Sequence, residues 1–283
     1  MHLADLVSRI QSQYHTSHPS SLRVSSFLMT SQSSNTLLNR VPEVTIFFWI
    51  IKVLATTVGE TAADYLNEGM GLGLFRTAAV MTVTLLVALL FQLMRSRYVA
   101  PIYWLVIVLI SIAGTLATDI LTDALSVPLA VSTTIFAISL AVVFWLWRRA
   151  EGTISIHAIT SLPREIFYWL VVLFTFALGT ALGDLFAERF ELGYLSATGV
   201  FALAIGLVAL AYKRFGLRET VAFWTVFILT RPLGASFGDL LAQSKPDGGL
   251  GLGTMATTIL FLVAIVLMVG LTRAGRALVG QND

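Results

Sequence analysis

A pattern of tryptophan, glycine and aspartate recurs four times, and no other feature of the sequence constrains the fold as strongly. In each copy the aspartate follows a tryptophan by fifteen residues and a glycine by five. The aspartates are Asp64, Asp119, Asp184 and Asp239, the glycines Gly59, Gly114, Gly179 and Gly234, and the tryptophans Trp49, Trp104, Trp169 and Trp224. Agreement of three columns in four places indicates a fourfold internal repeat, each copy of which is one supersecondary unit.

The residues between these anchors are too apolar for a soluble domain. Hydrophobic residues make up 57% of the chain and charged residues only 12%, and apolar runs of roughly 20 residues can cross a bilayer. We expect eight spans, at about 43–66, 74–94, 102–122, 129–147, 165–187, 194–212, 220–241 and 253–272. The predicted fold is therefore all-α, a polytopic membrane bundle of eight transmembrane helices whose first partner is the lipid bilayer.

Each repeat holds two of these spans, of which the first carries the Trp, Gly and Asp columns and the second is almost wholly apolar. We place the repeats at about 41–97, 98–152, 160–216 and 217–276, within a membrane domain at 41–283. Because every repeat has an even number of spans, all four point the same way across the membrane. The aspartates are 55, 65 and 55 residues apart, so the chain divides into two pseudo-symmetric halves.

The first 40 residues differ in composition from the rest. Ser, Thr, Gln and His crowd residues 11–39, and the segment lacks the continuous apolar core of a signal peptide. We expect residues 1–40 to form a disordered polar tail in the cytoplasm. An alternative is that the chain starts at Met29, so that residues 1–28 are not translated.

The basic residues predict the orientation. Thirteen of the 18 Lys and Arg residues fall in the tail or in connectors on the side of the two termini, whereas Arg76, Arg189 and Lys245 fall on the opposite side. Positively charged connectors remain in the cytoplasm. Both termini are thus expected to be cytoplasmic.

Parallel repeats put the four aspartates at one depth, about 30 Å along their helices from the cytoplasmic side. There we expect a ring or two facing pairs. Positions four residues apart share a helix face, and on this face the next column holds Glu68, Asp123, Glu188 and Gln243. An ionisable side chain inside a span costs about a few kcal/mol, so it usually faces a cavity, a partner or a pathway. The alternatives are that the aspartates cap helix ends and that the outer column is simply solvated.

Three charged residues break the fourfold pattern. Lys52 and Glu60 lie two turns apart in the first span, and Arg231 lies in the span that carries Asp239. A buried arginine beside carboxylates is most simply their counter-ion, because removing it leaves charge unpaired. The alternative is a tethered cation that competes with a transported one or gates the cavity.

The available ligands suit hard cations. Carboxylates and hydroxyls bind Mg²⁺, Mn²⁺, Ca²⁺ or alkali ions, whereas the chain has no cysteine and its four histidines lie outside the spans. The predicted metal ligands are Asp64, Asp119, Asp184, Asp239 and Glu60, and the residues predicted to tune them are Lys52, Arg231, Glu68, Asp123 and Glu188. Neighbouring carboxylates cannot all ionise cheaply, so an unpaired cluster should also hold protons. The metal would be a substrate, since we expect no tightly bound cofactor.

The sequence lacks the common motifs of enzymes, so we do not expect the protein to be one. The chain has no GxxxxGK[ST], no HExxH and no GxSxG with partner residues, so we expect neither nucleotide hydrolysis nor common hydrolase chemistry. Nothing in the sequence predicts a nucleic-acid partner. We expect an interfacial aromatic belt near the cytoplasmic ends of the first spans, formed by Trp49, Tyr103, Trp104, Tyr168, Trp169 and Trp224.

Three runs carry a resemblance to a known family: VPEVTIFFWIIKVLATTVGETAADYLNEG, FYWLVVLFTFALGTALGDLFAE and FWTVFILTRPLGASFGDLLAQ. They resemble a bacterial family of uncharacterised membrane-anchored proteins built from four copies of a two-helix repeat of unknown function. The resemblance covers about residues 41–272. It implies a multi-pass protein of the bacterial inner membrane and assigns no substrate. The long tail departs from the short amino terminus expected of this family, which favours the later start.

These observations lead to three hypotheses. The leading one is a transporter that exchanges a hard inorganic cation such as Mn²⁺ for protons through an aspartate-lined cavity. The second is a non-transporting membrane scaffold whose glycine and aspartate columns only pack helices. The third, an intramembrane enzyme that uses paired carboxylates on a lipid, lacks an evident nucleophile. The sequence leaves the oligomeric state open, and a homo-oligomer is compatible with it.

Overall fold

The structure, a computed structural model, describes residues 39–279. Within them it contains eight long helices and no strand, which confirms the predicted all-α class and the number of spans. The helices are α3 (Ile46–Asp64), α4 (Leu74–Leu93), α5 (Ala100–Asp119), α6 (Leu129–Glu151), α7 (Leu162–Asp184), α8 (Gly193–Phe215), α9 (Glu219–Ala242) and α10 (Thr254–Val279). The predictions for residues 1–38, including the tail and the start at Met29, lie outside the described residues.

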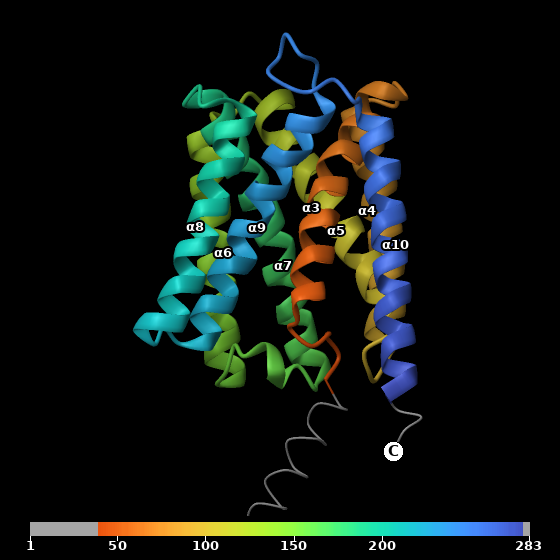
Figure 1. The fold of residues 1–283 in the computed structure, drawn as a ribbon, viewed down its shortest axis with the longest axis vertical. Helices are drawn as coiled ribbons and strands as arrows, with labels where there is room; N and C mark the ends of the chain where they lie inside the picture. The colour runs from red at the N-terminus through yellow and green to blue at the C-terminus, as the bar shows by residue number, and fades with distance from the viewer. Residues whose placement is uncertain (1–38, 280–283) are drawn as a thin grey trace, which may run out of the picture.

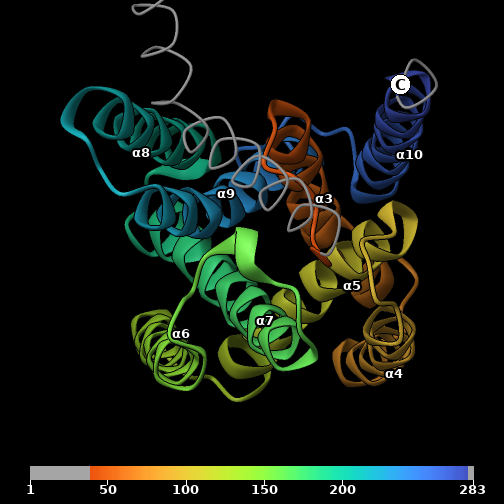
Figure 2. The same ribbon diagram turned by 90° about the horizontal axis from the view of Figure 1, so that it is seen from below.

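The first helix of each repeat is inside the bundle and the second is outside. Helices α3, α5, α7 and α9 form a closed ring, in which each packs against two others (Figure 2). Their apolar segments are 61–67% buried, against 11–22% for α4, α6, α8 and α10. The second helices are therefore the lipid-facing layer, which explains why their sequences are almost wholly apolar.

Each outer helix covers the inner helix of the next repeat rather than its own. Helix α4 packs on α5, α6 on α7 and α8 on α9, and the last helix, α10, returns to cover α3. The start of α3 and the end of α10 lie at the same end of the bundle (Figure 1). We call this the terminal end, and the opposite end, where the four aspartates lie, the aspartate end.

The glycine column explains how the inner helices come so close. Each of the four glycines faces the next inner helix around the ring, at a position where a side chain would collide. An added Cβ would lie 1.8 Å from Ser111 Oγ at Gly59, 2.9 Å from Phe176 Cβ at Gly114, 2.3 Å from Arg231 Cγ at Gly179 and 1.9 Å from Thr56 Oγ1 at Gly234. The expectation that small residues let these backbones approach is confirmed.

Three inner helices widen directly after their aspartate. Asp64, Asp119 and Asp184 each end an α-helix and precede a five-residue π-helix, at Tyr65–Gly69, Ile120–Ala124 and Leu185–Arg189. In the fourth repeat α9 instead continues past Asp239 to Ala242. Single π-turns inside helices often mark functional sites, and here they set the direction in which the chain leaves the aspartate layer.

Two short segments close the terminal end. Residues 39–45, which precede α3, pack against the 152–161 connector, where Arg40 N donates to Ile159 O at 3.0 Å and Asn39 Nδ2 to Ile156 O at 3.1 Å. The Arg40 side chain then reaches Glu165 at the start of α7, at 2.7 Å. Glu165 is fully buried and also accepts a hydrogen bond from Gln92 of α4 at 2.8 Å. Asn39 and Arg40, at the boundary of the expected tail, are thus part of the packed bundle.

Candidate functional site

Residues spaced by four along the inner helices share a face, and together they form four buried layers between the terminal end and the aspartates. The layers are an aromatic layer (Phe48, Tyr103, Tyr168, Phe223), a lysine layer (Lys52, Ile107, Val172, Phe227), an arginine layer (Thr56, Ser111, Phe176, Arg231) and a glutamate layer (Glu60, Thr115, Thr180, Ala235). No member of these layers is more than 6% exposed. The terminal half of the ring is therefore solidly packed, whereas exposure begins at the aspartates.

Arg231 joins all four inner helices in the arginine layer. Its guanidinium donates to Thr56 O at 2.6 Å and to Glu60 Oε2 at 2.9 Å on α3. On the other two inner helices it donates to Thr115 Oγ1 and, at 2.7 Å, to Thr180 Oγ1. The side chain is completely buried, so the expectation that Arg231 is a counter-ion is confirmed for Glu60.

Lys52 lies one layer nearer the terminal end and has no carboxylate against it among its described contacts. Its ammonium donates to Phe227 O at 3.0 Å and to Thr230 Oγ1 at 2.6 Å. It also lies 3.9 Å from the centre of the Phe227 ring and 4.9 Å from that of Phe176, distances at which a cation is attracted to the ring face. Lys52 is thus held by neutral groups among the described residues, in surroundings where a positive charge is costly.

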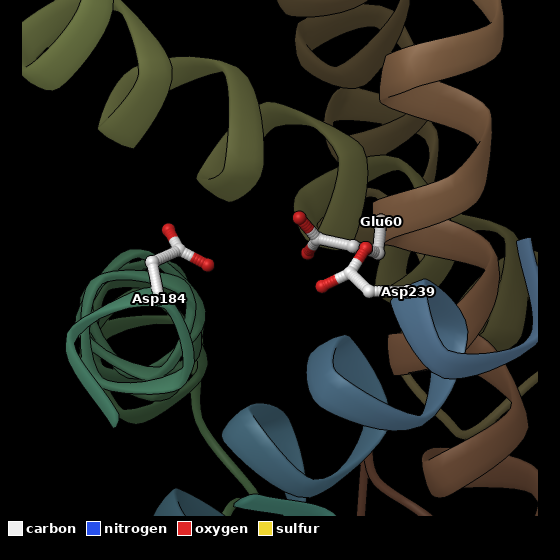
Figure 3. Close-up of side chains that lie close together, drawn as sticks. All are labelled: Glu60, Asp184 and Asp239. Atoms are coloured by element: carbon white, nitrogen blue, oxygen red, sulfur yellow. The ribbon is translucent and has the colours of Figure 1, made fainter. Parts of the chain in front are cut away.

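Three carboxylates from three helices converge just beyond Arg231. Oxygens of Glu60 on α3, Asp184 on α7 and Asp239 on α9 lie within 4.8 Å of one another. Figure 3 shows Glu60 and Asp239 side by side and Asp184 facing them from across the ring. Glu60 and Asp239 are 5% and 8% exposed, and Asp184 is half-buried. We call these three residues the carboxylate triad.

The other predicted site residues lie around the triad. Asp64 and Asp119 are half-buried and interact electrostatically with Glu60 and Arg231, but they do not join the triad. Glu68 and Asp123 lie in the π-helices at the aspartate end and are exposed. The side chain of Glu188 lies outside the part of the chain that the structure describes.

Charge is unbalanced around the triad. Glu60, Asp64, Asp119, Asp184 and Asp239 contribute five negative charges when all are ionised, and Lys52 and Arg231 contribute two positive charges. Acidic residues therefore outnumber basic ones here, in a partly desolvated place where neighbouring carboxylates cannot all ionise cheaply. Such a group of acids can hold a cation, protons or both.

The geometry of the triad suits one hard cation. Ligand oxygens of Mg²⁺ and Ca²⁺ lie at about 2.0–2.6 Å, so two oxygens on one ion are at most about 4–5 Å apart. Separations of up to 4.8 Å fit an ion of the size of Ca²⁺, whereas a smaller ion such as Mg²⁺ or Mn²⁺ would draw the three carboxylates slightly closer together. The hydroxyl groups of Thr115 and Thr180 lie next to them, on the guanidinium that neutralises Glu60.

The sequence missed two features of this site. Thr230 accepts a hydrogen bond from Lys52, although it lies outside the four-residue columns, because a neighbouring position of α9 meets α3.

The interfacial belt was the wrong interpretation of the aromatic residues. Trp49 is half-buried, and the other five are buried: Tyr103, Trp104, Tyr168, Trp169 and Trp224. The Tyr103 and Tyr168 hydroxyls share a hydrogen bond of 2.5 Å inside the aromatic layer. These residues close the terminal end of the ring instead of anchoring it in lipid.

Comparison with known families agrees with the repeat found in the sequence. The family profile described as Repeat of Unknown Function (DUF347) matches the chain four times, at residues 47–98, 102–153, 167–217 and 222–276. No curated protein and no solved structure matched the chain. The four matched segments coincide with the four pairs of inner and outer helices.

Proposed function

Since the chain belongs to the family of the DUF347 repeat of unknown function, we propose its function from the site itself: the protein is a membrane transporter that exchanges a hard divalent cation for protons. The observation that carries this proposal is the carboxylate triad of Glu60, Asp184 and Asp239, within 4.8 Å, in the centre of a ring of membrane-spanning helices. Such a site can hold either a metal ion or protons, and an exchanger needs both states.

The charge balance supports a definite stoichiometry. A divalent ion that enters the triad brings two positive charges, so it displaces two protons from the acids around it. Movement between these two states exchanges one divalent ion for two protons without net charge transfer. Mn²⁺ is the substrate that we propose to test first, because it prefers oxygen ligands in sites of this kind.

The layers give the exchanger a closed side and an accessible side. The aromatic, lysine and arginine layers block the ring toward the terminal end, which the positive-inside rule assigns to the cytoplasm of a bacterial cell. Beyond these layers, on the opposite side, Asp64, Asp119 and Asp184 are half-buried and Asp239 is 8% exposed. In this arrangement the cation leaves or enters on the outer face, and a second conformation would have to separate the packed layers.

Arg231 and Lys52 are proposed to tune the site. Arg231 forms an ion pair with Glu60 at 2.9 Å, so a cation that enters the triad competes with it for the same carboxylate. A proton on Lys52 would add a second positive charge one layer away, which lowers the affinity for cations and so favours their release.

The proposal is tested with purified protein in liposomes. External Mn²⁺ should drive Mn²⁺ uptake, reported by a trapped indicator, together with acidification of the outside at two protons per ion. Clamping the membrane potential to zero should leave the rate unchanged. Asp184→Asn should reduce uptake at least tenfold, whereas Asp247→Asn, which alters an exposed acid in the α9–α10 connector, should have no effect.

A scaffold without transport is the second candidate, favoured by the glycine contacts between the inner helices. For a scaffold, Asp184→Asn combined with Asp239→Asn lowers the yield of folded protein and alters no flux. Equal Mn²⁺ binding by this double variant and the wild type, both folded, would reject the triad as the ion site.

A further inference from the structure

A second site lies away from the ring centre, on the outside of the inner helices. A cavity of about 720 Å³ lies between α3, α8 and α9, and Figure 2 shows α9 set between the other two helices. Trp49 and Val53 line it from α3, Val208 from α8, and Val226 and Thr230 from α9. Several lining residues are exposed, so the cavity opens to the surroundings of the bundle.

The lining of the cavity is polar at the terminal end and apolar toward the middle of the bundle. Its walls are mainly Val, Ile, Leu, Ala and Phe side chains along the three helices. The polar lining residues apart from Thr230 gather at the terminal end: Ser155 and His157 from the 152–161 connector, and Glu219 and Thr220 from the first turn of α9. The cavity thus suits an amphiphile whose hydrocarbon chain points toward the middle of the membrane and whose polar head stays at the terminal end.

The length of the cavity corresponds to one leaflet. Along α9 its lining runs from Glu219 to Leu233, which is roughly 21 Å at the helical rise of 1.5 Å per residue. Half of a bilayer, headgroups included, is about 20–22 Å. A lipid of the leaflet at the terminal end therefore matches the cavity from headgroup to chain end.

The charge around the mouth selects the headgroup. Tyr212 lines the cavity, and the next two residues, Lys213 and Arg214, are exposed in the last turn of α8. Arg218 is the N-cap residue of α9, directly before Glu219, and is also exposed. Glu219 is the acid at the mouth and lies 3.0 Å from His157. None of these three basic residues lines the cavity itself, and Glu43, exposed beside the lining residue Val44, is a second acid near the mouth. Three basic residues against two acids leave an excess of positive charge, which favours an anionic headgroup.

We propose that this cavity binds an anionic phospholipid of the leaflet at the terminal end, with one acyl chain against Val53, Val208 and Val226 and the phosphate group near Lys213, Arg214 and Arg218. The inference does not depend on the proposed transport. It has a structural consequence, because Thr230 lies at the inner wall and holds Lys52 at 2.6 Å. A bound chain supports the contact between α3 and α9 at the lysine layer.

The proposal can be tested by native mass spectrometry of the purified full-length protein, titrated with dioleoylphosphatidylglycerol or dioleoylphosphatidylcholine. The two lipids have the same chains, so a difference reports the headgroup. We expect the first complex with the anionic lipid to form with at least tenfold higher affinity. Replacing all three basic residues with glutamine should remove this preference, and Val208→Trp, which fills the cavity, should lower the binding of both lipids. Leu203→Trp is the matched control, because Leu203 is 65% exposed on the same helix and is not among the cavity lining.

A second measurement needs no cavity-filling variant. Phosphatidylglycerol with brominated chains should quench the fluorescence of Trp49, which lines the cavity, in a Trp145→Phe background that removes an exposed tryptophan of α6. The quenched component should disappear in Trp49→Phe. Equal affinities for the two headgroups, or equal binding by Val208→Trp and Leu203→Trp, would overturn the proposal, as would quenching that is unchanged without Trp49.

Discussion

Arg231 shows how one side chain can hold a ring of helices together. It lies on α9 and contacts α3, α5 and α7 through Glu60, Thr115 and Thr180. The charge pattern predicted a counter-ion role for it. The sequence did not reveal which acids would meet, because Glu60 comes from the column one turn before the aspartates, and only the packing of the helices brings its carboxylate to those of Asp184 and Asp239.

Removing Arg231 alone should be costly. Arg231→Met leaves Glu60 buried without its counter-ion, and breaking a buried pair in this way costs about 3–5 kcal/mol. The free energy of unfolding, measured in mixed micelles with increasing SDS, should fall by this amount. Arg231→Met combined with Glu60→Met should recover most of the loss, since apolar replacement of a whole buried pair is often neutral. A single variant as stable as wild type would contradict this account.

The close contacts at the glycine column predict that adding one methyl group there, as in Gly59→Ala, lowers the free energy of unfolding. Gly59→Ala places a Cβ 2.4 Å from Ser111 Cβ and 2.9 Å from its backbone carbon, so α3 and α5 must move apart, at a cost of about 1–3 kcal/mol or more. Gly206→Ala on α8 is the control: nothing lies within 4 Å of its Cβ position, and alanine is the better helix former by up to about 1 kcal/mol. The same SDS titration should separate the two. Adding Ser111→Gly to Gly59→Ala removes the contacts with the serine side chain but not the one with its backbone, so it should recover part of the lost stability. No recovery at all would rule out a collision with the side chain.

At the scale of whole elements, hydropathy predicted all eight spans but not the details of their ends. The π-helices after Asp64, Asp119 and Asp184 have no sequence signature distinct from an α-helix, because they differ only in which carbonyl each amide meets. The aromatic residues were misplaced for a related reason. Tyr and Trp near helix ends suit both lipid interfaces and packed cores, and their helix face, which points inward here, becomes known only once the helices are assembled.

The tie between residues 39–45 and α7 predicts strong coupling between two elements. Arg40 and Glu165 form a pair in which the acid is completely buried and the arginine side chain is 15% exposed. A double-mutant cycle with Arg40→Ala and Glu165→Ala should give a coupling of about 1–3 kcal/mol in the free energy of unfolding.

The control for this cycle is the pair of Arg164 and Glu151, at 2.9 Å with side chains 28% and 21% exposed. Its coupling should stay below about 1 kcal/mol, because solvent screens it. Equal couplings for the two pairs would mean that burial of Glu165 does not strengthen its bond to Arg40.

At the scale of the whole molecule, the repeat predicted that the four units are parallel, but not which inner helix each outer helix packs against. Parallel repeats are compatible with outer helices that cover their own inner helix, the next one or none. In the structure, α4 covers α5 and α10 covers α3. This arrangement depends on the direction in which each connector leaves the aspartate end. That direction is set by the π-helices and by glycines with positive φ in the connectors, such as Gly73 at 79°, and hydrophobic periodicity does not encode it.

The orientation can be measured because the chain has no cysteine. Lys245→Cys places one thiol in the exposed α9–α10 connector at the aspartate end, and Ser96→Cys places one in the exposed α4–α5 connector at the terminal end. With the terminal end cytoplasmic, as the basic residues predict, a membrane-impermeant maleimide should label only Lys245→Cys in intact cells. Both variants should react after permeabilisation. Labelling of Ser96→Cys alone in intact cells would invert the orientation.

The contacts of α3 with both helices of the last repeat also constrain how the chain assembles during synthesis. The first inner helix enters the membrane with Lys52 and Glu60 already on it, yet their partners Thr230 and Arg231 are made last. Until the fourth repeat emerges, a nascent chain must carry two ionisable side chains in the bilayer without these contacts. Assembly therefore cannot proceed repeat by repeat as in an open solenoid, and a truncated chain lacking the last repeat would be a natural target for quality-control proteases.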